Sequence, residues 1–184
     1  MSKTNEQYDE VVDKCKKIFF TKNKDYGTAW RVLRTISVID QIFIKAQRIR
    51  TIQQTQQQKV EDDIAGEFKG IINYCVIGLI QLELPDDTTE ELSADKVETL
   101  YNKYIARAKS LMLNKNHDYG EAWRSMSQES FTDLILMKLH RVKQILGNNG
   151  ETIISEGIDA NYYDMINYAI FALILRGEQE ANSK

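Results

Sequence analysis

Residues 115–124 read Lys-Asn-His-Asp-Tyr-Gly-Glu-Ala-Trp-Arg, and residues 22–31 read Lys-Asn-Lys-Asp-Tyr-Gly-Thr-Ala-Trp-Arg. The two decapeptides are identical at eight of ten positions and lie 93 residues apart. They also contain both tryptophans of the chain, Trp30 and Trp123. Agreement of this extent over so distinctive a set of residues indicates an internal repeat, in which each copy is one structural unit.

Apolar residues follow the same repeat on both sides of the decapeptide. Before it, they recur at three- and four-residue steps, as on one face of a helix, over residues 8–19 and again over 101–112. After it, Ser37-x-x-Asp40 and Ser130-x-x-Asp133 resemble capping boxes, which predicts that a second helix begins there in each copy. A third stripe over 64–79 returns over 158–173. We therefore expect three long helices in each copy, with a short helical turn at the Trp-Arg pair.

The scarcity of helix breakers favours an all-α protein. The chain of 184 residues has one proline and nine glycines, and no convincing alternating strand pattern. A three-helix unit leaves apolar faces open, and the second copy is the natural cover for them. We expect two tandem three-helix repeats packed about a pseudo-twofold axis into one compact, bundle-like body. The first repeat is expected at 1–84, the linker at 85–92 and the second repeat at 93–184.

Composition argues against several classes of protein. A net charge of −3 is unfavourable for stable binding to nucleic acid, because such proteins usually carry a basic surplus. Cys15 and Cys75 lie at apolar helix positions without a CxxC neighbour, which predicts buried free thiols. The polar N-terminus lacks the apolar core of a signal peptide, and no apolar run is long enough to span a membrane. We expect a cytoplasmic protein. The sequence is compatible with either a monomer or a homodimer.

The polar residues of the decapeptide have two interpretations. A capping turn with a buried aromatic side chain explains its Tyr, Gly, Ala and Trp without any function. This turn does not explain why charged residues recur in both copies, and their repetition favours a binding role. The candidate ligand-binding residues of the decapeptides are Lys22, Asn23, Asp25, Tyr26, Trp30 and Arg31, with Lys115, Asn116, Tyr119, Trp123 and Arg124 in the second copy. Of these, Tyr119 and Trp123 are the candidates for stacking on a base.

Cationic pairs on the second helices are further candidates, namely Lys45 with Arg48 and Lys138 with Arg141. Each pair lies at the edge of an apolar stripe, where long cationic side chains commonly extend toward water. Combined with Lys115 and Arg124, the second pair could instead form a cationic pocket for a polyphosphate. Asn73 and Asn167, at matching positions of the third helices, are also candidates for ligand contact.

Three carboxylates of the second copy, Asp118, Glu156 and Asp164, are the candidates for catalysis and for binding Mg²⁺. Asp164 immediately precedes the most apolar part of the third helix, and a carboxylate at such a boundary needs a cation. Magnesium favours a few oxygen ligands together with substrate phosphate. A salt bridge to Lys138 or Arg141 explains the carboxylates equally well. The second copy is expected to hold the more complete metal site, because Gly70 replaces Asp164 in the first.

The repeated decapeptide, the Ser-x-x-Asp and Lys-x-x-Arg patterns and Asp164-x-x-Asn167-Tyr168 together resemble the nucleotide modification associated domain 1 family, in two tandem copies over almost the whole chain. The resemblance implies a link with nucleotide or base modification. More distantly, the helix arrangement is similar to the MazG-like all-α nucleoside triphosphate pyrophosphohydrolases. Those enzymes bind Mg²⁺ through Glu-x-x-Glu and Glu-x-x-Asp. Here the matching places hold Lys138-x-x-Arg141 and Asp164-x-x-Asn167, which departs from that pattern.

The leading hypothesis is a nucleotide-handling protein. Its most specific version is a Mg²⁺-dependent hydrolase of a nucleoside triphosphate. The cations of the second copy would then hold phosphates, and its three carboxylates would bind the metal or position water. One alternative is a non-catalytic protein that binds a nucleotide or another phosphorylated small molecule. A second alternative is a helical scaffold, in which the decapeptides only lock one helix to another.

Overall fold

The structure is a computed structural model that describes residues 3–59, 63–153 and 156–183. Within these ranges, every regular element is a helix. The first copy contains α1 (Lys3–Tyr26), the 3-10 turn η1 (Ala29–Val32), α2 (Thr35–Thr55) and α3 (Ile64–Glu83). The second copy contains α4 (Ala94–Tyr119), the 3-10 turn η2 (Ala122–Ser125), α5 (Gln128–Gly147) and α6 (Ile158–Asn182). The predicted all-α class and the tandem three-helix repeat are confirmed.

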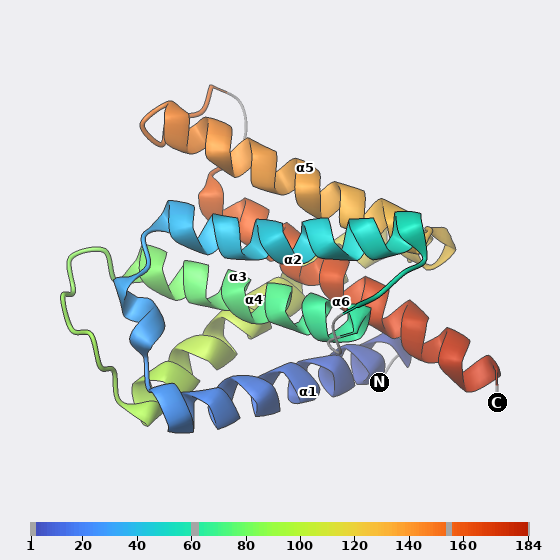
Figure 1. Ribbon diagram of the computed structural model, residues 1–184, viewed down its shortest axis with the longest axis horizontal. Coiled ribbons are helices and arrows are strands. Elements are labelled where there is room, and N and C mark those ends of the chain that lie inside the picture. Colours follow the sequence, from blue (N-terminus) through green and yellow to red (C-terminus); the bar gives the residue numbers. More distant parts are fainter. Residues whose placement is uncertain (1–2, 60–62, 154–155, 184) are drawn as a thin grey trace.

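The helices form three layers, and each layer contains one helix from each copy (Figure 1). α3 and α6 pack against each other in the middle layer. α2 and α5 cover one side of this central pair, and α1 and α4 cover the other. The central helices are buried along most of their length because they have neighbours on both sides, and this accounts for their nearly continuous apolar sequences.

The decapeptide forms the same turn in both copies. α1 and α4 end at a tyrosine, and the following Gly27 and Gly120 have φ values of +56° and +60°. Glycine adopts this left-handed backbone without the strain that a side chain adds. The amide of each glycine donates to the carbonyl four residues earlier, at 2.9 Å, and the tryptophan then lies in the 3-10 turn. The predicted helix exit and short turn are therefore confirmed.

The second helices begin earlier than predicted. α2 begins at Thr35 and α5 at Gln128, so the serines of both proposed capping boxes lie inside the first helical turn. α5 is capped by Ser127, whose hydroxyl accepts a hydrogen bond from the backbone N–H of Ser130 at 3.4 Å. The residue before α2, Arg34, has no capping side-chain bond. The two helices were predicted correctly, but their capping boxes were wrong.

The aspartates of these boxes instead join the two copies across the contact between α2 and α5. Asp40 pairs with Lys143 at 3.1 Å, and Asp133 pairs with Arg50 at 3.8 Å. Lys143 and Arg50 are equivalent positions of the repeat, so each ion pair is the pseudo-twofold image of the other. Such partly exposed pairs contribute little free energy. They nevertheless show that the copies are related by a twofold axis.

Two buried hydrogen-bond networks join the copies in the core. The Tyr8 hydroxyl on α1 donates to Oδ1 of Asn167 on α6 at 2.8 Å. The side-chain amide of Asn167 donates in turn to the carbonyl of Ala108 on α4 at 3.0 Å. The equivalent bonds join α4 to α3 and α3 to α1. The Tyr101 hydroxyl donates to Oδ1 of Asn73 at 2.8 Å, and the side-chain amide of Asn73 donates to the carbonyl of Cys15 at 3.1 Å. Each asparagine thus connects its own copy to a tyrosine of the other copy.

Two further expectations concern the thiols and the membrane. Cys15 and Cys75 are buried free thiols, as predicted. Burial raises the pKa of Cys15 to about 12 and raises that of Cys75 as well, so neither thiol is reactive at neutral pH. A search of the described helices finds none that is both long enough and apolar enough to cross a membrane.

The buried Tyr–Asn bonds predict matched losses of stability on the two sides of the molecule. Tyr8→Phe and Tyr101→Phe each remove one hydroxyl and leave an asparagine oxygen without its donor in the core. Each substitution is expected to lower the free energy of unfolding by about 1–3 kcal/mol. Urea unfolding measures this, with Tyr119→Phe as the control, because Tyr119 is 74% exposed. A loss at one tyrosine without the other would contradict the symmetry of the contact.

Candidate ligand-binding site

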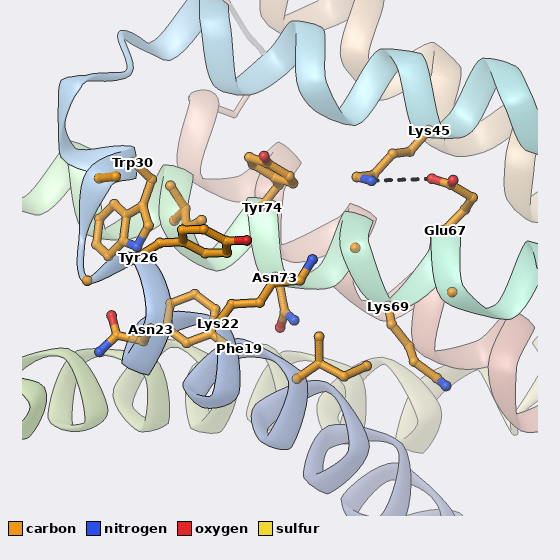
Figure 2. A pocket seen from close by; sticks show the side chains of 16 residues that line it. Phe19, Lys22, Asn23, Tyr26, Trp30, Lys45, Glu67, Lys69, Asn73 and Tyr74 are labelled. Atoms are coloured by element: carbon orange, nitrogen blue, oxygen red, sulfur yellow. Dashed lines mark hydrogen bonds and ion pairs between the residues drawn. The ribbon is translucent and has the colours of Figure 1, made fainter. Parts of the chain in front are cut away.

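A cavity lies in the first copy between α1, η1, α2 and α3 (Figure 2). Its volume is about 440 Å³, within the range of about 300–1,000 Å³ that small-molecule sites usually occupy. The aromatic residues that line it are Phe19, Tyr26, Trp30 and Tyr74. The charged residues that line it are Lys22, Lys45, Lys69 and Glu67. Three elements of the sequence repeat therefore meet here: the decapeptide, the second-helix cation and the third helix.

The cavity carries more positive than negative charge. Glu67 is the sole carboxylate among its described lining residues, and it pairs with Lys45 at 3.4 Å and with Arg48 at 2.6 Å. Arg48 and Glu67 balance each other, which leaves the lysines in excess. In Figure 2 the amine ends of Lys22 and Lys45 turn into the cavity from α1 and α2, whereas the amine of Lys69 points away. The resulting positive potential favours an anion.

The second copy contains the matching cavity, but its volume is only about 210 Å³. The ring of Trp123 stacks on Phe171, with centroids 4.2 Å apart and ring planes 6° apart. Trp123 is consequently 6% exposed, and the guanidinium of Arg124 lies 4.5 Å from its ring centroid. The equivalent Trp30 is only partly buried, and Ile77 stands at the position of Phe171 in the first copy.

Asp164 lies between two lysines of the second copy. Its Oδ1 accepts from Lys115 at 2.7 Å, and its Oδ2 accepts from Lys138 at 2.6 Å. Burial by itself would raise the pKa of Asp164, but the two lysines outweigh burial and hold this pKa below its ordinary value. Burial would lower the pKa of Lys115, which the neighbouring carboxylate raises instead. The salt bridge predicted with Lys138 is present, and Lys115 adds a second.

The arginines of the decapeptides bind neighbouring segments of the chain rather than facing a cavity. Arg31 donates to the side chain of Gln81 and to the backbone carbonyls of Asp87 and Thr89, just before α4. Arg124 donates to the side chains of Thr4, Gln7, Glu121 and Glu178. Both guanidinium groups thus fix the 3-10 turns in place, which is a structural role, whereas the sequence predicted contact with phosphate.

The other predicted residues divide between the cavities, the core and the surface. Asn23 and Tyr26 line the first cavity, and Asn116 and Tyr119 line the second. Asn73 and Asn167 also border the cavities, but their amide groups are engaged in the buried bonds to tyrosine. Asp25 and Arg141 are exposed and lie outside the lining of both cavities.

The three carboxylates predicted to bind magnesium have different surroundings in the structure. Asp118 has a side chain that is 75% exposed and lies 3.1 Å from His117. Glu156 is exposed in the segment before α6, and both oxygens of Asp164 bind lysines. Across residues 3–59, 63–153 and 156–183, no group of three or more His, Cys, Asp or Glu side chains is placed to hold a metal ion. Magnesium binding by these residues stays a prediction.

Sequence reasoning missed two features of the site. Glu67 matches Asn161 in the repeat, and Gly70 matches Asp164. Among the described lining residues, each cavity therefore has one carboxylate on its third helix, at positions about one helical turn apart. The sequence comparison considered only the position equivalent to Asp164, which is Gly70, and so it overlooked the carboxylate of Glu67. The stack of Phe171 on Trp123 was missed as well, although the replacement of Phe171 by Ile77 is visible in the aligned copies.

The contacts of Asp164 predict a stabilisation that depends on pH. Asp164→Asn should lower the free energy of unfolding by about 2 kcal/mol at neutral pH, because two cations then face a neutral amide and one of them, Lys115, is half exposed. The pKa of Asp164 in the folded state lies below its ordinary value of 3.8, so the stabilisation is present above that pH. It is lost as the pH falls through the folded-state pKa. Denaturant unfolding of both proteins in acid should show their stabilities converge; an undiminished gap would contradict this.

The arginine contacts predict an effect on stability alone. Arg31→Ala and Arg124→Ala each leave several acceptors without a donor, so each should lower the free energy of unfolding by about 1–3 kcal/mol. The exposed Arg141→Ala is the matched control and should change stability little. Thermal unfolding measures the loss. Reduced affinity for a ligand in a variant that keeps its full stability would show that the arginine contacts the ligand.

Comparison with known proteins gives two matches within the chain. The family model described as nucleotide modification associated domain 1 matches residues 22–82 and again residues 115–175. Each match begins at the first lysine of a decapeptide and ends within the third helix of its copy, so it includes most of the residues that line each cavity. Searches of curated proteins and of solved structures gave no match, and none of these comparisons shows the similarity to MazG-like enzymes.

Proposed function

The chain belongs to the nucleotide modification associated domain 1 family, and from this premise we propose that its first copy binds a nucleotide. The cavity between α1, η1, α2 and α3 holds the ligand, with the base against the aromatic side chains and the phosphates at the lysines. The family description supports a role connected with nucleotides, and the cavity supplies a place of suitable size.

The observation that carries the proposal is that aromatic rings and excess positive charge meet in one cavity. Trp30 is partly buried and Tyr26 is 71% exposed, so both rings have surface available to a flat ligand. Stacking of a base on an aromatic side chain is worth about 1–3 kcal/mol. Lys22 and Lys45 direct their amines into the same space, where they are placed to form charge-assisted hydrogen bonds with phosphate.

Binding without hydrolysis is the activity that the geometry supports best. Metal-assisted hydrolysis of a triphosphate needs oxygen ligands for the ion and a positioned water molecule. Glu67 is the sole carboxylate among the described lining residues, and two cations already engage it. Turnover in the presence of magnesium is therefore the result that would redirect the proposal toward a Mg²⁺-dependent hydrolase.

A panel of the four ribonucleoside and four deoxyribonucleoside triphosphates tests the proposal. Each is added with and without Mg²⁺ while the melting temperature and the formation of product are followed. At least one triphosphate is expected to raise the melting temperature with a dependence on its concentration, as for any ligand that binds only the folded state. No product is expected. The absence of any shift across the panel would favour a structural scaffold.

Substitution of Lys22 tests whether the nucleotide binds in the first cavity. Lys22→Gln removes one cation from the cavity and is expected to weaken triphosphate binding about tenfold, the loss of roughly one charge-assisted hydrogen bond. Lys24→Gln is the matched control, because Lys24 lies on the same helix outside the cavity lining. Calorimetry measures both affinities. Equal affinities of the two variants would contradict the placement of the phosphates.

A further inference from the structure

The two cavities are built from equivalent positions of the repeat, and several of their residues differ. Two of these differences lie beside the lysine pair and the tryptophan. Gly70 and Ile77 of the first copy are replaced by Asp164 and Phe171 in the second. The lysine pair is kept, as Lys22 with Lys45 and as Lys115 with Lys138, and so is the tryptophan of each decapeptide. The cavity of the second copy is about half as large, at 210 Å³ against 440 Å³. Both replacements therefore add side-chain atoms to the same kind of cavity.

Each added side chain binds the group that a nucleotide is proposed to use in the first copy. The carboxylate of Asp164 bridges the two lysines, at 2.7 and 2.6 Å. The ring of Phe171 lies nearly parallel to Trp123, with planes 6° apart. Asp164 thus supplies an anion, as a phosphate does, and Phe171 supplies a flat ring, as a base does.

We infer that the second copy carries a built-in imitation of the ligand, and that the first copy is the single working site of the chain. Asp164 and Phe171 occupy the places that phosphate and base take in the first copy. This inference rests on the proposed nucleotide binding and specifies its orientation. The phosphate lies between the amines of Lys22 and Lys45, and the base stacks on Trp30 beside Ile77.

The close approach at Gly70 sets the path of Lys45 in the first copy. A Cβ atom at Gly70 would lie 2.9 Å from Cε and 3.2 Å from Nζ of Lys45, so the lysine crosses directly over the glycine. Because Gly70 has no side chain, the stem of Lys45 lies against the backbone of α3, and its amine pairs with Glu67 at 3.4 Å. In the second copy, Asp164 stands at that position and its carboxylate binds the equivalent lysine, Lys138, at 2.6 Å.

The spacing of the imitation also selects among nucleotides. Asp164 and Phe171 are seven residues apart on one helix, which separates them by roughly 10 Å along its axis. The first phosphate of a nucleotide lies closer to its base than this, whereas the outer phosphates of a polyphosphate chain reach farther. The first copy is therefore expected to bind a nucleoside triphosphate more tightly than the monophosphate of the same nucleoside.

Transplanting the imitation into the first copy is the direct test. Gly70→Asp places a carboxylate beside Lys22 and Lys45, and it is expected to weaken binding of the tightest triphosphate of the panel by at least about tenfold, while raising the melting temperature. Gly70→Asn fills nearly the same volume without charge and is expected to weaken binding much less. Calorimetry on the wild-type protein should give one nucleotide per chain. Equal effects of Asp and Asn, or two nucleotides per wild-type chain, would overturn the inference.

Opening the second copy is the complementary test. The double variant Asp164→Gly with Phe171→Ile recreates the residues of the first copy at these two positions, so its stoichiometry should rise from one triphosphate per chain toward two. If this variant does not fold, the effects of Gly70→Asp and Gly70→Asn still decide the question. Failure of the wild-type protein to bind any triphosphate would instead remove the proposed function itself. If the monophosphate bound as tightly as the triphosphate, the preference expected from the separation of Asp164 and Phe171 would be wrong.

Discussion

Two buried asparagines constrain the arrangement of the whole molecule. Each lies on a central helix and accepts a hydrogen bond from a tyrosine that belongs to the other copy. An amide in the core is costly without partners, so neither copy can satisfy its own asparagine by itself. The bonds therefore require that α1 packs against α6 while α4 packs against α3, which is the pseudo-twofold arrangement observed.

The same constraint positions the cavities. Because the asparagine also binds a carbonyl of the first helix in its own copy, the spacing between the first and third helices is set at that level. The decapeptide begins beyond this point and carries its lysine and tryptophan to the rim of the space between the helices. In the first copy the amines of Lys22 and Lys45 turn into one cavity, and an anion relieves their mutual repulsion. In the second copy Asp164 binds both Lys115 and Lys138, whereas in the first copy Glu67 pairs with Lys45 and Arg48.

Much of the fold could be predicted from the sequence, because a repeat and its apolar periodicity are local patterns. The helices, the glycine turns and the tandem arrangement all follow from residues close together in the chain. The roles of the arginines could not be predicted in this way. Arg124 binds Thr4 and Gln7, more than a hundred residues earlier, and local patterns contain no information about such partners. Repetition drew attention to the polar residues, but a residue repeated to hold a turn looks the same in sequence as one repeated to bind a ligand.

The candidate site shows a second limit of the same kind. Lys45 and Lys138 are equivalent, yet their carboxylate partners come from positions one helical turn apart, so aligning the copies residue by residue hides the correspondence. Charge balance within a cavity depends on which side chains face it, and periodicity alone does not determine that. The preference for the second copy as the more complete site followed from counting carboxylates there. In the folded protein those carboxylates are either exposed or bound to lysine.

A crystal structure of the protein soaked with a nucleoside triphosphate tests the central claim most directly. The account predicts one nucleotide per chain, with phosphates between Lys22 and Lys45 and the base on Trp30. It also predicts that the contacts of Asp164 and Phe171 in the second copy are unchanged. A nucleotide bound in the second copy, or bound on the surface away from both cavities, would contradict it.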